Sequence, residues 1–178
     1  YDLQQCHVPN ASVHDKSKGR VFKVSYGDIK LIEVADLRTM DDEALVREVL
    51  GSHPIVKNGA VAFEPRSAWH LRHARRILQE RGLAPEWRDQ LVAYAFEPIG
   101  GVNGHSIMAP EPMRLRALWA LHATGGLNAE HIAQGLTSDA PHVRAWTIRL
   151  AMEDGEATDD QFARFAELAK SDPSPVVR

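Results

Sequence analysis

From about residue 36 onward, apolar residues recur every three or four positions, which is the period of one buried helix face. Trp87, Leu91, Tyr94 and Ala95 form a clear stripe of this kind. The segment 111–123 is apolar on nearly all sides and is expected to be a central, covered helix. Capping and turn residues divide the region into successive helices, expected at about 39–50, 68–81, 85–97, 111–123, 128–136, 141–153 and 158–170.

One short pattern opens every second helix of this series. An apolar residue precedes an arginine at Arg72, Arg116, Arg144 and Arg178, and each interval between these arginines is long enough for one helix pair. Helical repeats of about this length are typical of a stacked-helix solenoid. We therefore predict a mainly α fold over residues 36–178, built from antiparallel helix pairs. We interpret the four arginines as structural repeat residues that bind carbonyls or acids of a neighbouring loop, with a ligand groove as the alternative.

Residues 1–35 carry a different pattern. Phe22, Val24 and Tyr26 alternate with Lys23 and Ser25, which predicts a half-buried strand, and a second short run covers 29–34. One or two strands do not form a stable sheet alone, so we expect them to complete a preceding β domain. The chain is accordingly interpreted as a piece of a longer protein with two parts, 1–35 and 36–178.

The composition of the chain argues against several kinds of function. Apolar residues make up 44% of the chain, which is enough for a core, and the net charge of −3 argues against a nucleic-acid groove. No apolar run approaches the roughly 20 residues of a membrane span. The single cysteine, Cys6, excludes an internal disulfide. Cys6-His7 lacks the second cysteine of a haem-attachment motif, because Leu3 occupies that position.

Two levels of resemblance add to this pattern. Residues 138–146 and 171–178 resemble HEAT repeats, with an Asp near the turn, a Pro, and Val-Arg opening the second helix. Residues 19–27, 72–82, 117–127 and 143–150 together resemble the middle of the large membrane-bound dehydrogenase-like proteins of planctomycetes. That resemblance implies an upstream β-propeller, whose last strands would be residues 1–27, and a downstream cytochrome c module. It also implies a periplasmic or exported protein, with haem c bound elsewhere in the parent chain.

Four histidines are candidates for chemistry. His70 and His73 share a predicted helix face, and with His142 or Glu80 they are candidates for a metal site. A solvated helix face is the simpler interpretation. His122, on the apolar helix, is interpreted as a satisfied core or interface histidine, since no acidic partner is spaced to activate it.

The segment 98–112 is expected to be a long loop and is the best candidate for a binding insertion. Its candidate residues are Gly100, Gly101, Asn103, Gly104 and His105. An earlier irregular stretch covers 54–67, with a possible short strand at 60–63.

The sequence leaves three hypotheses of function. The first is a non-catalytic helical linker of a multi-domain redox protein, with the flanking domains as partners and no cofactor of its own. The second is a stand-alone scaffold that binds another protein, and the third is an enzyme with its site in the segment 98–112. In the helical part we predict six largely buried side chains: Trp87, Leu118, Trp119, Trp146, Phe162 and Phe165.

Overall fold

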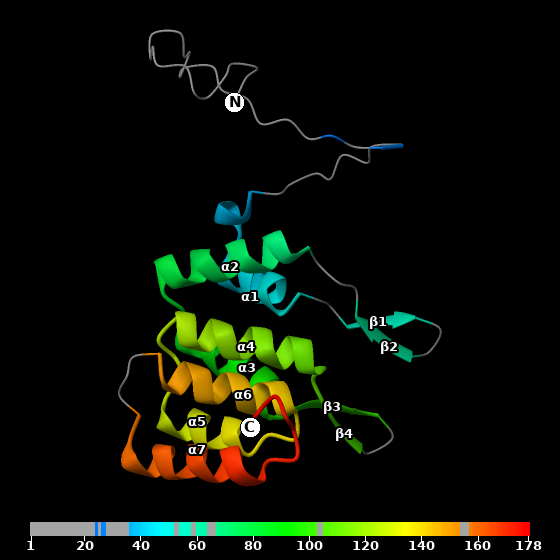
Figure 1. The fold of residues 1–178 in the computed structure, drawn as a ribbon. Helices are drawn as coiled ribbons and strands as arrows, with labels where there is room; N and C mark the ends of the chain where they lie inside the picture. Colours follow the sequence, from blue (N-terminus) through cyan, green and yellow to red (C-terminus); the bar gives the residue numbers. More distant parts are fainter. Residues whose placement is uncertain are drawn as a thin grey trace, which may run out of the picture. The chain divides into compact units, whose positions relative to one another are not determined.

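The computed structural model describes residues 24, 26, 27, 36–51, 54–57, 60–63, 67–102, 105–153 and 157–178. The chain divides into two units, Tyr1–Ala35 and Asp36–Arg178. In the first unit, the strands predicted at 20–26 and 29–34 lie almost wholly outside the described residues, as does Cys6-His7; Val24 and Tyr26 are described and fully exposed. The second unit is mainly helical (Figure 1).

The helices begin and end close to the positions that the sequence predicts. A short 3-10 turn at Leu37–Thr39 precedes the first of them. The described α-helices are α1 (Asp42–Leu50), α2 (Ala68–Arg81), α3 (Pro85–Phe96), α4 (Glu111–Ala123), α5 (Ala129–Leu136), α6 (Pro141–Ala151) and α7 (Asp159–Ser171).

Local capping explains most of these boundaries. Asn128 and Thr158 each form a capping box at the start of α5 and α7, so that orphan backbone N–H groups are satisfied. A proline in the first turn, where the missing N–H costs nothing, opens α3, α4 and α6. The cap of α1 is Asp41, whose side chain accepts from the Ala44 N–H, whereas Thr39 belongs to the preceding 3-10 turn.

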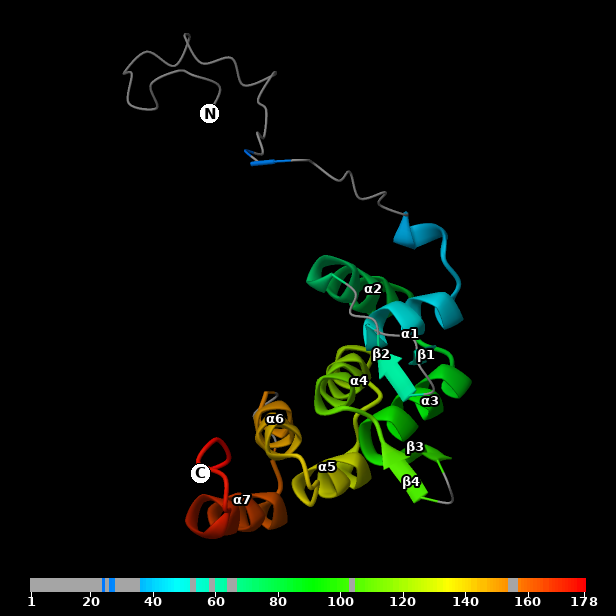
Figure 2. The ribbon, with the colours of Figure 1, turned by 90° about the vertical axis from the view of Figure 1, so that its right-hand side faces the viewer.

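The helices pack as consecutive pairs: α1 with α2, α3 with α4, and α5 with α6. The pairs also contact one another in order, because α4 packs against both α2 and α6 while α3 packs against α1 and α5. The second helices therefore form one layer and the first helices the other (Figures 1 and 2). The central position predicted for α4 is confirmed, since it contacts α1, α2, α3 and α6.

The connections inside the first two pairs are β-hairpins and not irregular loops. Strand β1 (Pro54–Lys57) pairs antiparallel with β2 (Ala60–Phe63), which confirms the short strand predicted at 60–63 and adds a partner. Strand β3 (Pro98–Val102) pairs with β4 (His105–Met108), so the prediction of a long loop over 98–112 was wrong. Glycines at 100 and 101 obscured that strand, because glycine is depleted in strands. Both hairpins project from the same side of the helices (Figure 1).

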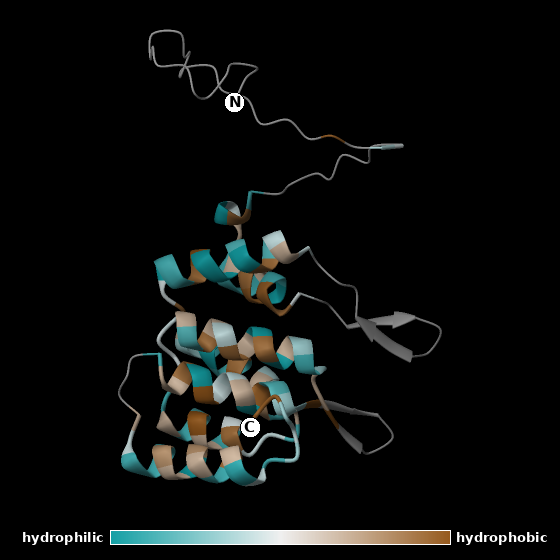
Figure 3. Ribbon diagram, viewed as in Figure 1, coloured by the Kyte–Doolittle hydropathy of each residue, from teal (hydrophilic) through white to brown (hydrophobic). Residues whose placement is uncertain are grey.

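The core lies between the two layers. Its largest fully buried side chains include Leu45, Leu78, Leu91, Leu118 and Leu121. Apolar positions recur along each helix between polar ones (Figure 3). Of the six side chains predicted to be buried, Leu118 is fully buried, and Trp87, Trp119, Trp146 and Phe165 are only half-buried.

Phe162 is the clear exception to the predicted burial, with 47% of its surface exposed. On the same helix Ala166 and Ala169 are exposed, and Leu168 is the buried residue. The periodicity of α7 identifies an apolar face, but burial requires a neighbour to cover it. Among the described helices, none packs extensively on that face of α7.

Candidate binding groove

Arg144 links α6 to the turn that follows α7. Its Nε and Nη2 donate to the two carboxylate oxygens of Asp172, each at 2.7 Å, and its Nη1 donates to the Ser138 carbonyl at 2.7 Å. Only 11% of the Arg144 side chain and 2% of the Asp172 side chain are exposed. A bidentate arginine–carboxylate pair is among the strongest polar contacts in proteins, so this pair holds α6 against the turn that follows α7.

Arg114 makes the corresponding link one helix pair earlier. Its Nη1 donates to the Asp139 carboxylate at 2.7 Å, its Nη2 to Ser138 Oγ at 2.8 Å, and its Nε to the Ala95 carbonyl at 3.1 Å. Residues 138–139 and 171–172 are the same Ser-Asp dipeptide in consecutive turns. The position in α4 that is equivalent to Arg144 is therefore Arg114, and it is almost fully buried.

The four arginines singled out by the sequence have different roles in the structure. Arg144 and Arg178 occupy related positions, and Arg178 Nη1 donates to the Asp172 carbonyl at 2.5 Å. Arg116 donates from Nη1 to the Leu50 carbonyl at 3.0 Å, a contact with the preceding helix pair. Arg72 bonds within its own helix, from Nε to the Ala68 carbonyl at 3.2 Å.

Sequence reasoning missed Arg114 because both Met113-Arg114 and Leu115-Arg116 fit the apolar-arginine pattern. The distance along the chain to Arg144 distinguishes Arg114 from Arg116. Two intervals can precede the one from Arg144 to Arg178: one starts at Arg114 and the other at Arg116. The interval that starts at Arg114 is the closer of the two in length to the Arg144–Arg178 interval. A more regular repeat is therefore obtained through Arg114.

The two ion pairs shift the ionisation of their carboxyl groups. The hydrogen bond from the Arg144 guanidinium lowers the pKa of Asp172 below its ordinary value, and the hydrogen bond from Arg114 lowers the pKa of Asp139 in the same way. The hydrogen bond to Asp172 in turn raises the pKa of Arg144. Both carboxyl groups are therefore ionised at neutral pH.

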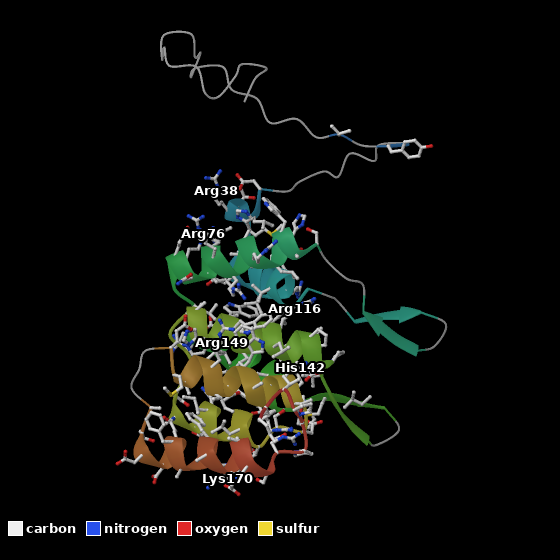
Figure 4. All side chains as sticks on the ribbon, viewed as in Figure 1. Arg38, Arg76, Arg116, His142, Arg149 and Lys170 are labelled. Carbon is white, nitrogen blue, oxygen red and sulfur yellow. The ribbon has the colours of Figure 1, made fainter. Side chains whose placement is uncertain are left out.

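A groove of about 710 Å³ runs across the layer formed by α2, α4 and α6. This volume lies within the range of sites that hold small molecules or short peptide segments. Figure 4 shows Arg116 and Arg149 on this layer. The groove is lined by Val49, Ala68, Leu71, Arg72, Arg75, Gln79, Arg116, Trp119, His122, Ala123, Trp146, Leu150 and Glu153.

The aromatic part of the groove is the pair Trp119–Trp146. Their ring centroids are 4.9 Å apart in an edge-to-face arrangement, and each ring also faces a guanidinium. Arg75 lies 5.8 Å from the Trp119 centroid and Arg149 lies 4.8 Å from the Trp146 centroid. Such contacts orient the guanidinium groups without neutralising their charge.

His122 has an acidic partner that the sequence analysis did not find. Its Nε2 lies 2.7 Å from Glu153 Oε2, and both residues line the groove. The contact crosses from α4 to the segment just after α6, so no local pattern connects the two residues. The two side chains form a polar pair in the groove, with 26% of the His122 side chain and 60% of the Glu153 side chain accessible.

The other sequence candidates are not brought together. His70 Nδ1 contacts Ser67 Oγ at 2.7 Å, His142 Nδ1 contacts Glu111 at 3.1 Å, and Glu80 pairs with Arg76. In the part of the chain that the structure describes, no group of three or more His, Cys, Asp or Glu residues is placed to hold a metal.

Segment 98–112 is the part of the chain that the sequence favours as a binding insertion. Gly100, Gly101 and His105 lie in the strands of the β3–β4 hairpin, while Asn103 and Gly104 lie outside the described residues. The hairpin residues with described side chains are Pro98, Ile99, Ile107 and Met108, and none of these four lines the groove.

The chain matches no protein-family model, no curated protein and no solved structure. Among the helices that are described, none combines the length and the apolar character needed to cross a membrane.

Proposed function

We propose that residues 36–178 form a non-catalytic helical scaffold, a HEAT-like α-solenoid that holds neighbouring parts of a protein in a fixed arrangement. The observation that supports this function is a repeated link, in which a buried arginine of one helix bonds to the turn after the next helix. Arg114 makes it to residues 138–139, and Arg144 makes it to Asp172. Nearest-neighbour links of this kind are what stabilise a linear repeat array.

The wider setting of this scaffold comes from the sequence resemblance alone. In that setting the helices lie between an upstream β-propeller of the dehydrogenase-like type and a downstream cytochrome c module of an exported protein. Haem c belongs to the downstream module, and the scaffold itself holds no cofactor. Its contribution to electron transfer is geometric, because the stacked helices fix the separation of the two flanking domains.

A stand-alone interaction scaffold is the second candidate. The groove across α2, α4 and α6 favours it, because repeat arrays present extended surfaces of this kind to protein partners. The two candidates share one fold and differ in whether the flanking domains or a separate protein is the partner.

Rigidity across the helix pairs is the first testable consequence. Spin labels attached at exposed positions Arg76 on α2 and Lys170 on α7, in a Cys6→Ser background, are expected to give one narrow distance distribution by electron–electron double resonance. The two arginine links are the reason, since Arg114 couples α4 to the turn after α5 and Arg144 couples α6 to the turn after α7. Labels at Asp159 and Lys170, both on α7, provide the width expected within a single helix. A much broader or bimodal distribution for the first pair would contradict a rigid scaffold.

The redox setting has its own test in the longer protein. Deleting residues 36–178 is expected to leave the flanking domains folded but to slow haem reduction by substrate, because the separation of the two redox centres is no longer fixed. Stopped-flow absorbance of the haem measures this rate, and circular dichroism checks folding. Haem reduction at the original rate would reject the spacer role and leave the stand-alone scaffold.

A further inference from the structure

The groove contains a cluster of arginines without acidic partners. Arg114 and Arg144, outside the groove, each pair with an aspartate at 2.7 Å. Within the described part of the chain, Arg72, Arg75 and Arg116 have no ion-pair partner, and the one acidic residue of the groove lining, Glu153, is bound to His122. The groove therefore presents three guanidinium groups whose charge the described residues do not compensate.

This cluster is electrostatically unfavourable in the free protein. Partial burial lowers the pKa of Arg75, and the nearby charge of Arg72 lowers it further. Burial also lowers the pKa of Arg116, whose Nη1 is the one donor bonded to a described acceptor, the Leu50 carbonyl. Uncompensated charge in a hollow is characteristic of binding sites, because a bound anion removes the repulsion and satisfies the free donors.

The neighbouring surface is apolar and aromatic. Trp119 and Trp146 are half-buried, and Leu71, Val49 and Leu150 continue the lining on either side. Tryptophan and arginine are among the residues that contribute most of the binding energy of protein interfaces. A ligand that fits this surface carries negative charge beside an apolar group.

Two observations favour an acidic peptide over a nucleic acid. The net charge of the chain is −3, which weakens the attraction of an extended polyanion. In addition, the groove lining includes the acidic Glu153, which would repel a phosphate bound beside it. A peptide avoids this repulsion because its acidic residues need not be consecutive. A neutral or hydrogen-bonding residue of the peptide can therefore face Glu153.

We propose that the groove across α2, α4 and α6 binds an acidic peptide segment of a partner protein. Arg72, Arg75 and Arg116 bind its carboxylates, and the Trp119–Trp146 pair packs against an apolar side chain of the same segment. The binding goes beyond the scaffold role, and a rigid stack measured by spin labels would stand even if no peptide bound.

The test uses a phage-displayed library of twelve-residue random peptides, selected against the full chain at low salt. Enriched sequences are expected to contain several Asp or Glu residues and at least one large apolar residue. The best peptide is then synthesised in two forms, one with its acids replaced by the matching amides. Fluorescence anisotropy is expected to show roughly ten- to hundredfold weaker binding of the amide form. Added salt should weaken the acidic form only.

Protein variants locate the site. Arg75→Gln and Arg116→Gln are each expected to weaken the acidic peptide roughly tenfold. Arg76→Gln is the matched control on α2, because Arg76 is exposed and paired with Glu80, and it should leave binding unchanged. Thermal melting verifies that each variant is folded, and Arg75→Gln removes no described hydrogen bond.

Several results would overturn the proposal: no enrichment of any peptide, enrichment without acidic residues, equal binding of the amide form, or equal weakening by Arg76→Gln. Tighter binding of a twelve-nucleotide oligothymidylate than of the selected peptide would overturn it in favour of a single-stranded nucleic acid.

Discussion

Arg144→Ala is expected to lower the free energy of unfolding by about 1.5–3 kcal/mol, the usual cost of losing hydrogen bonds between charged groups. The variant removes two bonds to Asp172 and one each to the Ser138 and Asp139 carbonyls, and it leaves the Asp172 carboxylate without its guanidinium. Because the Asp172 side chain is 2% exposed, water does not replace the lost partner easily. Urea unfolding followed by circular dichroism measures the change.

Arg164→Ala is the matched control for this prediction. Arg164 also pairs with an acid, Glu167, but 37% and 62% of the two side chains are exposed. Exposed pairs contribute less than about 1 kcal/mol, so the urea midpoint should barely move. If Arg144→Ala and Arg164→Ala lowered the free energy of unfolding equally, the Arg144–Asp172 link would stabilise the protein no more than an exposed ion pair.

The same link predicts how stability depends on pH. The pKa of Asp172 is lowered in the folded protein by Arg144, so its contribution is present above the ordinary aspartate pKa near 3.8. It is lost as the pH falls below that value towards the lower folded pKa, because the carboxylate must then be protonated. Asp172→Asn is therefore expected to reduce the loss of stability between about pH 5 and pH 2, measured as urea midpoints. An identical pH profile for both proteins would contradict this assignment.

Gly135→Ala is expected to destabilise the protein although alanine is the better helix former. Alanine in place of glycine gains about 1 kcal/mol in an open helix. At Gly135, however, a Cβ would lie 2.8 Å from Thr147 Cγ2 and 3.1 Å from Thr147 Cβ, and closer still to its hydroxyl oxygen. Thr147 is fully buried and its hydroxyl bonds to the Val143 carbonyl at 2.8 Å, so it cannot turn away.

The cost of this overpacking is roughly 1–3 kcal/mol, which outweighs the gain in helix propensity. Thermal and urea unfolding measure the net loss. The double variant Gly135→Ala/Thr147→Ala is the internal control, because it removes both clashing atoms of the threonine beyond Cβ. It is expected to be more stable than the sum of the single changes. A stabilising Gly135→Ala would mean that α5 and α6 do not pack as closely as the structure shows.

Local sequence signals determine where the helices begin and end, but they do not show which arginine of a helix makes the link to the next turn. The bounds of α2, α4 and α5 follow from capping residues and prolines that act within one turn, so the sequence predicts them correctly. The choice between Arg114 and Arg116 is different, because both follow an apolar residue in the same helix. Only the position of the Ser138-Asp139 turn in space shows that Arg114 makes the link to the next helix pair.

By itself, then, the sequence determined the mainly helical character, the pairing order of the helices and the central place of α4. These depend on periodicity and caps, which act over a few residues. The tertiary structure alone decided the hairpin at 98–108, the exposure of Phe162 and the groove. The groove residues come from α1, α2, α4 and α6, and Glu153 reaches His122 from just beyond the end of α6. No local pattern links such residues, because their contact is produced by the stacking of the helices and not by the chain between them.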